Sequence, residues 1–490
     1  MKFNKLITIA IIMLCLLNGC HSDLDIVQNN ALSAGNMWLD ESDATMATNG
    51  LYIYMRNSLK TVGDAYLCWG ESRNGLWGAG THSTLSSSDE TEVHTNSMSS
   101  TNVFANWENF YKTINQANLI IKYVPQMDIP EHTAKYCLGN AHFARAWSYF
   151  WIARIWGDAP MPTEGYESAD DDFMLPRAPK NEILPNIVEK DILAAESYIT
   201  EANNKYVATP AAVQMLKADY ALWMYRVLKS GDSYLNMASQ AIAALGLNSN
   251  VQLESDYADI FSSDNKVGCE VIFAIRQAQG EATDGVAYYL GWNSVYIAIP
   301  SRNNPVPITG GQQWWWYTDR YKEILSAVSS DTRTKLTFCS DDLGPLGETV
   351  EWTEKSMGRM NGNTRVYDSD YILYRYGEAF LLDAEIKYYQ QNYSGALSAL
   401  SAITNRAYGQ SDFYSDENPD AVKQAIIDEN LKELVAEGRT WWMLIRMDAI
   451  WNYNSYITDK RANNPNILLW PITQTSMNSN RQLKQTEGWY

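Results

Sequence analysis

The sequence predicts a mainly α-helical protein that two long, loop-rich insertions interrupt. Apolar residues recur at three- and four-residue steps over most of the chain, which is the spacing of one helix face. The helical segments arrive in pairs, as in helical-repeat scaffolds of the tetratricopeptide type, although an irregular all-α core is the alternative. Two stretches, 61–100 and 280–317, lack this period and carry Gly and Ser, so we expect long loops there.

The first nineteen residues have the pattern of a secretory signal. Lys2 and Lys5 precede an apolar run that ends at Leu17 and is too short to span a membrane as a helix. The following Asn18-Gly19-Cys20 resembles the site at which signal peptidase cleaves before a lipidated cysteine. We predict a signal peptide over 1–19 and a lipid on Cys20; an ordinary signal peptide with a chance cysteine is the alternative.

Residues 20–490 are expected to form one large body, because no Pro-rich or Gly/Ser linker separates compact units after Asn30. We divide this body into a helical-repeat half over 20–230 and a second half over 231–490, which contains the loop-rich region 280–320. The helical period predicts helices over Glu41–Leu59, Trp107–Val124, Asn140–Met161, Glu182–Ile199, Pro210–Leu228, Tyr234–Leu245, Ile372–Tyr389 and Ser394–Ala407.

The predicted helix Asn140–Met161 is the most apolar and aromatic stretch of the body. Phe143, Trp147 and Phe150 form one stripe, and Tyr149, Ile152 and Trp156 form a second. Because two faces require burial, we place this helix at the centre of the molecule. Gly157 and Pro160 predict its end, with a left-handed cap.

Composition argues against several classes of protein. Removing residues 1–19 takes away two of the 38 basic residues and leaves 57 acidic ones, so the mature net charge is about −21. Nucleic acid is therefore not an expected partner. Cys68, Cys137, Cys269 and Cys339 form no CxxC pair, so we expect buried free thiols rather than zinc or redox sites.

Catalytic and cofactor motifs are not found in the sequence. GxSxG, HExxH, P-loop and GxGxxG patterns are missing, and there are only five histidines. A glycoside hydrolase remains conceivable from the many carboxylates, but the sequence selects no acid and base pair. Acidic clusters at 170–172 and 341–342 lack the alternating spacing of a calcium loop. We predict no enzyme activity, no cofactor and no metal.

Several sequence blocks resemble the SusD/RagB family of nutrient-binding outer-membrane lipoproteins of Bacteroidetes. The first is the helix with Ala144-Arg145-Ala146, Tyr149-Phe150, Arg154 and Trp156-Gly157-Asp158-Ala159-Pro160. The others are Arg177 with Asp191–Ala195, Asp331-Thr332-Arg333, Tyr371–Glu385, Asn405-Arg406-Ala407, Glu429–Arg446 and Leu468–Tyr490. The resemblance runs from Cys20 to Tyr490.

The resemblance implies a SusD-like fold and a non-enzymatic protein that is exposed at the surface of the outer membrane through its lipid anchor. Acidic residues just after Cys20 resemble the surface-export signal of such lipoproteins. By resemblance, the protein captures oligosaccharides and delivers them to a SusC-like TonB-dependent transporter. Oligopeptide capture, as in the RagB branch, is the alternative within the family, and a surface adhesin or structural repeat protein is the alternative outside it.

The two expected loops carry the side chains that we select as candidate ligand contacts. A sugar ring stacks its C–H face on Trp or Tyr, while its hydroxyls bond to groups such as Arg and Asn. The chain has 18 Trp and 31 Tyr against 11 Phe, which favours rings with a polar group. The alternative is that these rings fill the cores of the loops. The candidates are Trp69, Arg73, Asn74, Trp77, Trp292, Tyr296, Trp314, Trp315 and Trp316.

Charged residues near the C-terminus are expected to have a structural role. Glu433, Glu437, Arg439 and Arg446 are predicted to form a helix-borne network that holds the C-terminal segment against the body. Trp441 and Trp442 are expected in the core.

Overall fold

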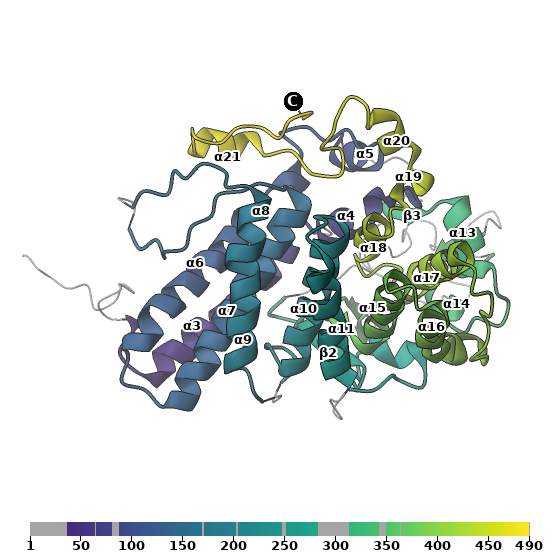
Figure 1. Cartoon of the computed structure of the whole chain (residues 1–490), viewed down its shortest axis with the longest axis horizontal. Helices are drawn as coiled ribbons and strands as arrows, with labels where there is room; N and C mark the ends of the chain where they lie inside the picture. The colour runs from purple at the N-terminus through teal and green to yellow at the C-terminus, as the bar shows by residue number, and fades with distance from the viewer. Residues whose placement is uncertain are drawn as a thin grey trace, which may run out of the picture.

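The computed structural model describes residues 37–63, 65–80, 88–168, 171–201, 204–246, 251–282, 313–342, 349–362 and 364–489. Helices dominate these residues, which confirms the predicted mainly α class (Figure 1). Cys20 and the signal segment lie outside the described residues. The described part of the chain holds no helix that is both long and apolar enough to cross a membrane.

Four helices of the N-terminal half pack side by side (Figure 1). They are α3 (Glu41–Leu59), α6 (Glu108–Tyr123), α7 (Glu131–Ile155) and α9 (Lys190–Tyr198). Helix α3 begins where the sequence predicts, because Asp40 and Asp43 form a reciprocal capping box at its first turn. The apolar face of α6 is buried through Phe110, Ile114 and Ala117.

Helix α7 is the most deeply buried of these elements. From Cys137 to Trp156 every side chain except the half-buried His142 is buried, so both predicted stripes are covered. Gly157 has a φ of +78°, which confirms the left-handed stop. The two arginines of α7 are paired, since Arg145 contacts Asp191 on α9 at 2.7 Å and Arg154 contacts Asp219 at 2.9 Å.

Further helix pairs follow, namely α10 (Pro210–Arg226) with α11 (Asp232–Gly246) and α15 (Tyr376–Tyr389) with α16 (Tyr393–Tyr408). Helix α17 (Pro419–Glu433) packs on both members of the second pair. Pro210 occupies the first turn of α10, where a backbone N–H would have no acceptor within the helix, so its missing N–H costs nothing. Thr209 caps the same end. The tetratricopeptide-type repeat and the division into two halves stay predictions.

Two predicted helices differ from the observed elements. Residues 371–375 form strand β8 (Tyr371–Arg375) ahead of α15, because they pair with β2 (Val271–Ile275), a contact distant in sequence. The predicted helix over 182–199 consists of α8 (Lys180–Ile183), a π-helical segment (Leu184–Glu189) and α9. Pro185 lies at the start of the π-helical segment and lacks the N–H that a regular α-helical ladder needs.

Four two-stranded antiparallel sheets lie among the helices of the described chain. They pair β1 (Trp77–Ala79) with β3 (Trp315–Tyr317), β2 with β8, β4 (Cys339–Asp341) with β5 (Val350–Trp352), and β6 (Arg359–Asn361) with β7 (Thr364–Val366). The short elements are α4 (Ala65–Gly70), η1 (Ser72–Asn74), α5 (Ser88–His94), η2 (Val103–Ala105), η3 (Val124–Gln126), η5 (Tyr257–Phe261), α13 (Asp319–Ser326), α14 (Thr334–Thr337), α18 (Thr440–Arg446), α19 (Ile450–Tyr453), α20 (Ser455–Lys460) and α21 (Gln474–Ser479).

The stretch 61–100 is therefore more ordered than the loop that the sequence predicts. It contains η1 together with α4, β1 and α5, and side chains of these last three elements pack into the same apolar cluster as the long helices. That cluster includes Ala44 of α3 and Trp489 near the C-terminus. The C-terminal segment is joined to α7 by the backbone bond from Trp470 N to Ile155 O, 2.7 Å long.

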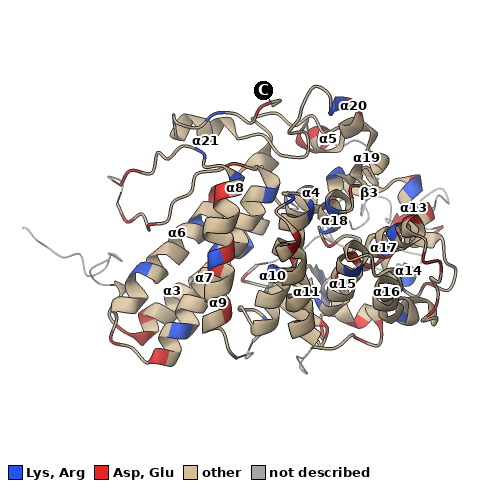
Figure 2. Ribbon diagram, viewed as in Figure 1, with Lys and Arg blue, Asp and Glu red and all other residues tan. Residues whose placement is uncertain are grey.

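The four charged residues predicted to form a network near the C-terminus are all paired, but their partners lie on other elements and not among the four. Lys and Arg are interspersed with Asp and Glu along the ribbon (Figure 2). Arg375 lies 2.7 Å from Glu433 and 2.8 Å from Glu437, while Arg446 lies 2.8 Å from Glu385. Trp441 and Trp442 are buried in the core, as expected.

These charges do not lie on one continuous helix, contrary to the prediction. Helix α17 ends at Glu433 and α18 begins at Thr440, with Ala436 and Gly438 between them at φ values of +62° and +67°. A side chain at Gly70 would meet the carbonyl of Gly438, so the two segments approach closely only because position 70 has no Cβ. The carboxylate of Glu71 accepts the N–H groups of Ala436 at 2.9 Å and Gly438 at 2.8 Å.

The cysteines of the described chain are free thiols. Cys68 and Cys137 are buried as expected, but Cys269 and Cys339 are only half-buried.

Candidate functional site

Three of the candidate tryptophans belong to the core of the protein. The side chains of Trp69, Trp77 and Trp315 are 0 % exposed. Trp69 packs edge-on against Trp156 and donates its Nε1–H to the carbonyl of Phe104 at 2.8 Å. None of the three rings presents a face on which a sugar could stack. The structure therefore corrects their assignment as ligand contacts. The segments that carry these rings fold inward, because burial of large apolar surfaces is favourable.

Arg73 and Asn74 are also buried and serve to join distant segments. Arg73 donates to the carbonyls of Ile467 at 2.6 Å and Leu468 at 3.2 Å, and burial lowers its pKa to about 9. Asn74 donates to Thr440 Oγ1 at 3.0 Å. Their polar groups bond to protein partners, so the structure corrects the prediction that they donate to the hydroxyls of a ligand. Instead they hold the C-terminal segment against the body.

The remaining candidates lie at or beyond the edge of the described chain. Trp316 is 5 % exposed and donates its Nε1–H to Glu351 at 2.7 Å, so it too is mainly a core residue. Trp314 is half-buried and immediately precedes β3. Trp292 and Tyr296 lie outside the described residues, and their assignment stays a prediction.

The pairing of β1 with β3 brings the ends of the two predicted loop regions together. Ala79 lies opposite Trp315, and the N–H of Gly80 bonds to the carbonyl of Trp314 at 3.0 Å. Gly80 also lies against Gln313, so the described residues that flank 81–87 and 283–312 in the chain meet at one end of the ribbon. We call this end the ribbon edge (Gly80, Gln313 and Trp314).

A third chain segment begins beside the ribbon edge. Glu351 is the second residue of β5, the strand that follows residues 343–348. Its backbone carbonyl accepts a hydrogen bond from Gln313 Nε2 at 3.0 Å, and its carboxylate lies 2.6 Å from Lys322. The hydrogen bond from Gln313 thus places Glu351 of β5 next to the ribbon edge.

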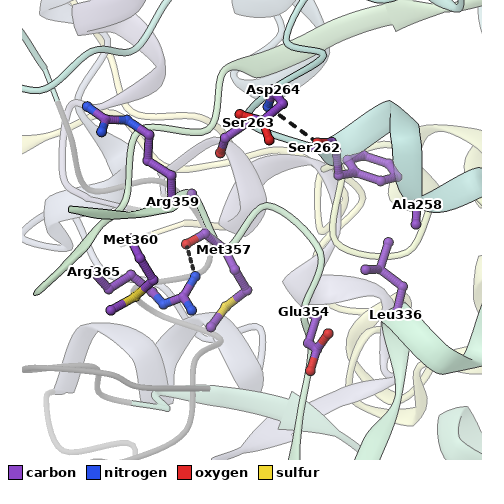
Figure 3. Close-up of a pocket in the computed structure, with 12 residues that line it drawn as sticks. Ala258, Ser262, Ser263, Asp264, Leu336, Glu354, Met357, Arg359, Met360 and Arg365 are labelled. Atoms are coloured by element: carbon purple, nitrogen blue, oxygen red, sulfur yellow. Dashed lines mark hydrogen bonds between the residues drawn. The ribbon is translucent and has the colours of Figure 1, made fainter. Parts of the chain in front are cut away.

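A polar pocket of about 410 Å³ lies between the β6–β7 hairpin and the segment that follows η5 (Figure 3). We call it the hairpin pocket. Its walls combine charged and hydroxyl groups with apolar side chains, and its lining includes Phe261, Ser263, Glu354, Met357, Arg359 and Arg365. This volume falls within the range of small-molecule sites in proteins.

Local backbone geometry determines the shape of the hairpin pocket. Gly358 enters β6 with a φ of +67°, and a Cβ there would meet the carbonyl oxygen of Val366. Arg365 donates to the carbonyl of Met357 at 3.1 Å, and burial lowers its pKa (Figure 3). Arg359 pairs with Asp368 at 2.9 Å. The two guanidinium groups are thereby held in place on the hairpin.

The hairpin pocket offers hydrogen-bonding groups suited to a hydroxyl-rich ligand. Ser263 Oγ is buried and has no hydrogen-bond partner among the described residues. Glu354 supplies a carboxylate and Arg365 a guanidinium, which accept from and donate to hydroxyls respectively. Sequence reasoning missed this pocket, because three-residue strands leave too few positions to show an alternating pattern. The Gly358 and Gly362 flanking β6 were the available turn signals.

The described residues contain no group of three or more His, Cys, Asp or Glu that could hold a metal ion.

Comparison with solved structures defines the class of protein to which this fold belongs. A SusD superfamily protein from Bacteroides fragilis matches with a TM-score of 0.79 and 24% identity over 92% of this chain and 100% of its own. B. fragilis NanU matches with a TM-score of 0.78 and 24% identity over 94% and 99% of the two chains. A SusD superfamily protein from Bacteroides vulgatus gives 0.76 at 25% identity, covering 92% and 100%.

Comparison with family models and with related sequences gives the same class of protein as the solved structures. A model described as "Starch-binding associating with outer membrane" matches residues 71–223, and a model of the SusD family matches residues 349–489. SusD-like protein P38 of Formosa agariphila is 23% identical over 99% of both chains, and SusD-like protein P2 of that organism is 24% identical over 89% of both. The chain belongs to the SusD/RagB family, a group of outer-membrane-associated, carbohydrate- and nutrient-binding proteins.

Proposed function

We propose that this protein captures oligosaccharides at the outer surface of the outer membrane and passes them, uncleaved, to a SusC-like TonB-dependent transporter. The observation that carries the proposal is the pairing of β1 with β3 in a chain of this family. The pairing places Gln313 and Trp314, which follow residues 283–312 in the chain, beside Gly80 at the ribbon edge and above the buried rings of Trp77 and Trp315.

In this proposal the ligand contacts come from Trp292 and Tyr296, with Trp314 at the ribbon edge. Polar groups of the hairpin pocket supply hydrogen bonds to hydroxyls on the same side of the site. Two contacts support this arrangement: Arg359 and Asn361 both donate to Gln279 Oε1, at 3.3 and 3.1 Å, and Gln279 lies shortly before residue 283. Buried Trp77 and Trp315 hold the ribbon beneath the site.

Calorimetry with a panel of maltohexaose, cellohexaose, xylohexaose and mannohexaose tests the capture of glycans. Wild-type protein is expected to bind at least one of them. Trp292→Ala and Tyr296→Ala are each expected to weaken that binding roughly ten- to hundredfold, by analogy with the 1–3 kcal/mol per stacked ring measured for bases. Tyr456→Ala is the matched control, because this ring is 42 % exposed on α20, outside the proposed site.

Three outcomes would overturn parts of the proposal. Release of shorter sugars after long incubation with the panel would establish an enzyme. Binding of hexapeptides in place of all four glycans would assign the protein to oligopeptide capture. Wild-type affinity in both ring variants would move the site away from residues 283–312.

Delivery to a transporter is tested by affinity purification of the tagged protein from outer membranes in mild detergent. The expected result is a stable complex with a large TonB-dependent barrel protein. Recovery of the protein alone, from membranes in which the barrel is detected by mass spectrometry, would remove the transport part of the proposal.

A further inference from the structure

A second cavity of about 340 Å³ lies between the start of α6, the segment between α7 and α8, and α21 at the C-terminus. Its lining includes four aromatic rings, from Trp107, Tyr111, Tyr166 and Phe173. We call it the aromatic pocket. In Figure 1, α21 lies above the long connection between α7 and α8, away from the label of β3 and hence from the ribbon edge.

The aromatic wall of this pocket is held by hydrogen bonds to the body. Asn115 on α6 bonds both backbone groups of Tyr166, accepting from its N–H at 2.7 Å and donating to its carbonyl at 3.1 Å. The hydroxyl of Tyr111 donates to the carbonyl of Pro160 at 2.8 Å. Phe173 lies edge-on to Tyr166 with ring centroids 6.4 Å apart, yet it is 47 % exposed. The wall thus presents an accessible ring in a fixed setting.

The C-terminal wall of the pocket combines hydroxyl groups of α21 with the side chains of Asn480 and Leu483. Helix α21 has no fully buried residue and contacts the core through the partly buried Met477. It directs Thr475, Ser476 and Ser479 to the pocket, while Gln474 and Asn478 bond to each other at 2.9 Å elsewhere on the helix. Asn480 fixes this segment by donating to the carbonyl of Leu175 at 2.8 Å.

The combination of an aromatic wall and a hydroxyl wall restricts the chemistry of the occupant. A purely apolar ligand would remove water from the hydroxyls of Thr475 and Ser479 and replace none of their hydrogen bonds, which disfavours its binding. The lining has no Lys, Arg or His among the described residues to pair with an anionic ligand, and its one carboxylate belongs to Glu108. A neutral sugar satisfies both walls, since its C–H face stacks on a ring and its hydroxyls bond to Ser and Thr.

We propose that the aromatic pocket is a second saccharide-binding site, separate from the ribbon edge, that holds a neutral sugar unit between Phe173 and α21. This inference rests on the proposed function, because the sugar unit is part of the captured glycan. A second site would let one protein hold a long glycan at two points. Binding at one site raises the effective concentration of the glycan at the other, so the glycan is released more slowly.

The test uses the Trp292→Ala/Tyr296→Ala double variant, titrated with the same four hexasaccharides. We expect residual binding in this variant that Phe173→Ala weakens at least roughly tenfold. Met174→Ala is the matched control, because Met174 is the adjacent residue, is 39 % exposed and does not line the pocket. Ser479→Ala is expected to weaken the residual binding severalfold, whereas Asn478→Ala on the same helix leaves it unchanged.

The outcomes separate this inference from the proposed function. Binding by the wild type that disappears completely in the double variant would overturn the second site and leave glycan capture standing. Residual binding that Phe173→Ala does not weaken would also overturn it. Lack of binding by the wild type to every glycan would overturn both. Melting temperatures within about a degree of the parent for all pocket variants confirm that a lost signal is not a lost fold.

Discussion

Trp77 on β1 lies directly opposite Tyr317 on β3, and their rings meet edge-on with centroids 4.9 Å apart. The two residues are 0 % and 4 % exposed. This contact joins segments that are distant in sequence, and it is made by a residue that the sequence suggested as a ligand contact. The rings beneath the ribbon edge therefore contribute to stability.

Trp77→Ala and Trp315→Ala are each expected to lower the free energy of unfolding by about 3–5 kcal/mol, because each leaves a cavity in the core. Chemical denaturation measures the change. Tyr456→Ala on the exposed surface should change stability little. Unchanged unfolding midpoints for both tryptophan variants, with loss of glycan binding, would return these rings to the binding site.

Arg375→Ala is expected to destabilise the protein by about 3–5 kcal/mol, because it leaves Glu433 and Glu437 buried with one partner fewer. Burial alone would raise the pKa of Glu433, but Arg406, Arg375 and Arg333 outweigh it and hold this pKa well below its ordinary value. The control is Lys112→Ala, which breaks the exposed pair with Glu108 on α6. This control should cost no more than about 0.5 kcal/mol, and an equal effect of both substitutions would contradict a structural network.

The pH dependence of stability is expected to reflect Glu378. Burial raises its pKa from 4.5 to about 7, although Arg439 lies 3.6 Å away. Asp219 and Glu437 reinforce the rise, and Arg375 opposes it. The folded protein therefore holds this proton more tightly than the unfolded chain, so the contribution is complete below about pH 4.5 and is lost as the pH rises through about 7.

Stability from Glu378 should accordingly increase, by at most about 3 kcal/mol, when the pH falls from 8 towards 5. Burial also raises the pKa of Glu71 to about 7, which acts in the same direction. Below about pH 4.5 the depressed pKa of Glu433 acts in the opposite sense. Glu378→Gln should flatten the profile between pH 5 and 8, whereas Glu108→Gln on the surface should leave it unchanged. A slope unaltered by Glu378→Gln would show that other groups determine it.

Cys20→Ala is expected to release the protein from the membrane fraction, because it removes the residue predicted to carry the lipid. Mass spectrometry of the N-terminal peptide of the wild type should show a diacylated or triacylated cysteine at position 20. Cys15→Ala is the control, since position 15 lies within the predicted signal peptide and should not alter anchoring. An unmodified N-terminus at another residue would disprove lipidation.

Local sequence patterns were sufficient to predict most of the long helices and the central position of α7, but not α17 or the short helices of residues 61–100. Apolar spacing identified α3 and α10 to within a few residues, and the stripes of α7 require burial on two faces whatever the neighbouring elements are. The structural role of Glu433 and Arg446 was also predictable, since charges among apolar helix residues need partners.

The candidate site depended on contacts that a one-dimensional pattern does not contain. Strand β8 replaces a predicted helical turn because β2, about a hundred residues earlier, supplies its hydrogen bonds. Trp77 and Trp315 carry rings of the kind that stack on a sugar. Whether such a ring contacts a sugar or Tyr317 depends on which chain segments meet in space. Burial is a property of the whole fold. The sequence by itself thus determined most of the long helices and the chemistry available to the site, whereas tertiary packing decided which aromatic rings are left exposed to a ligand.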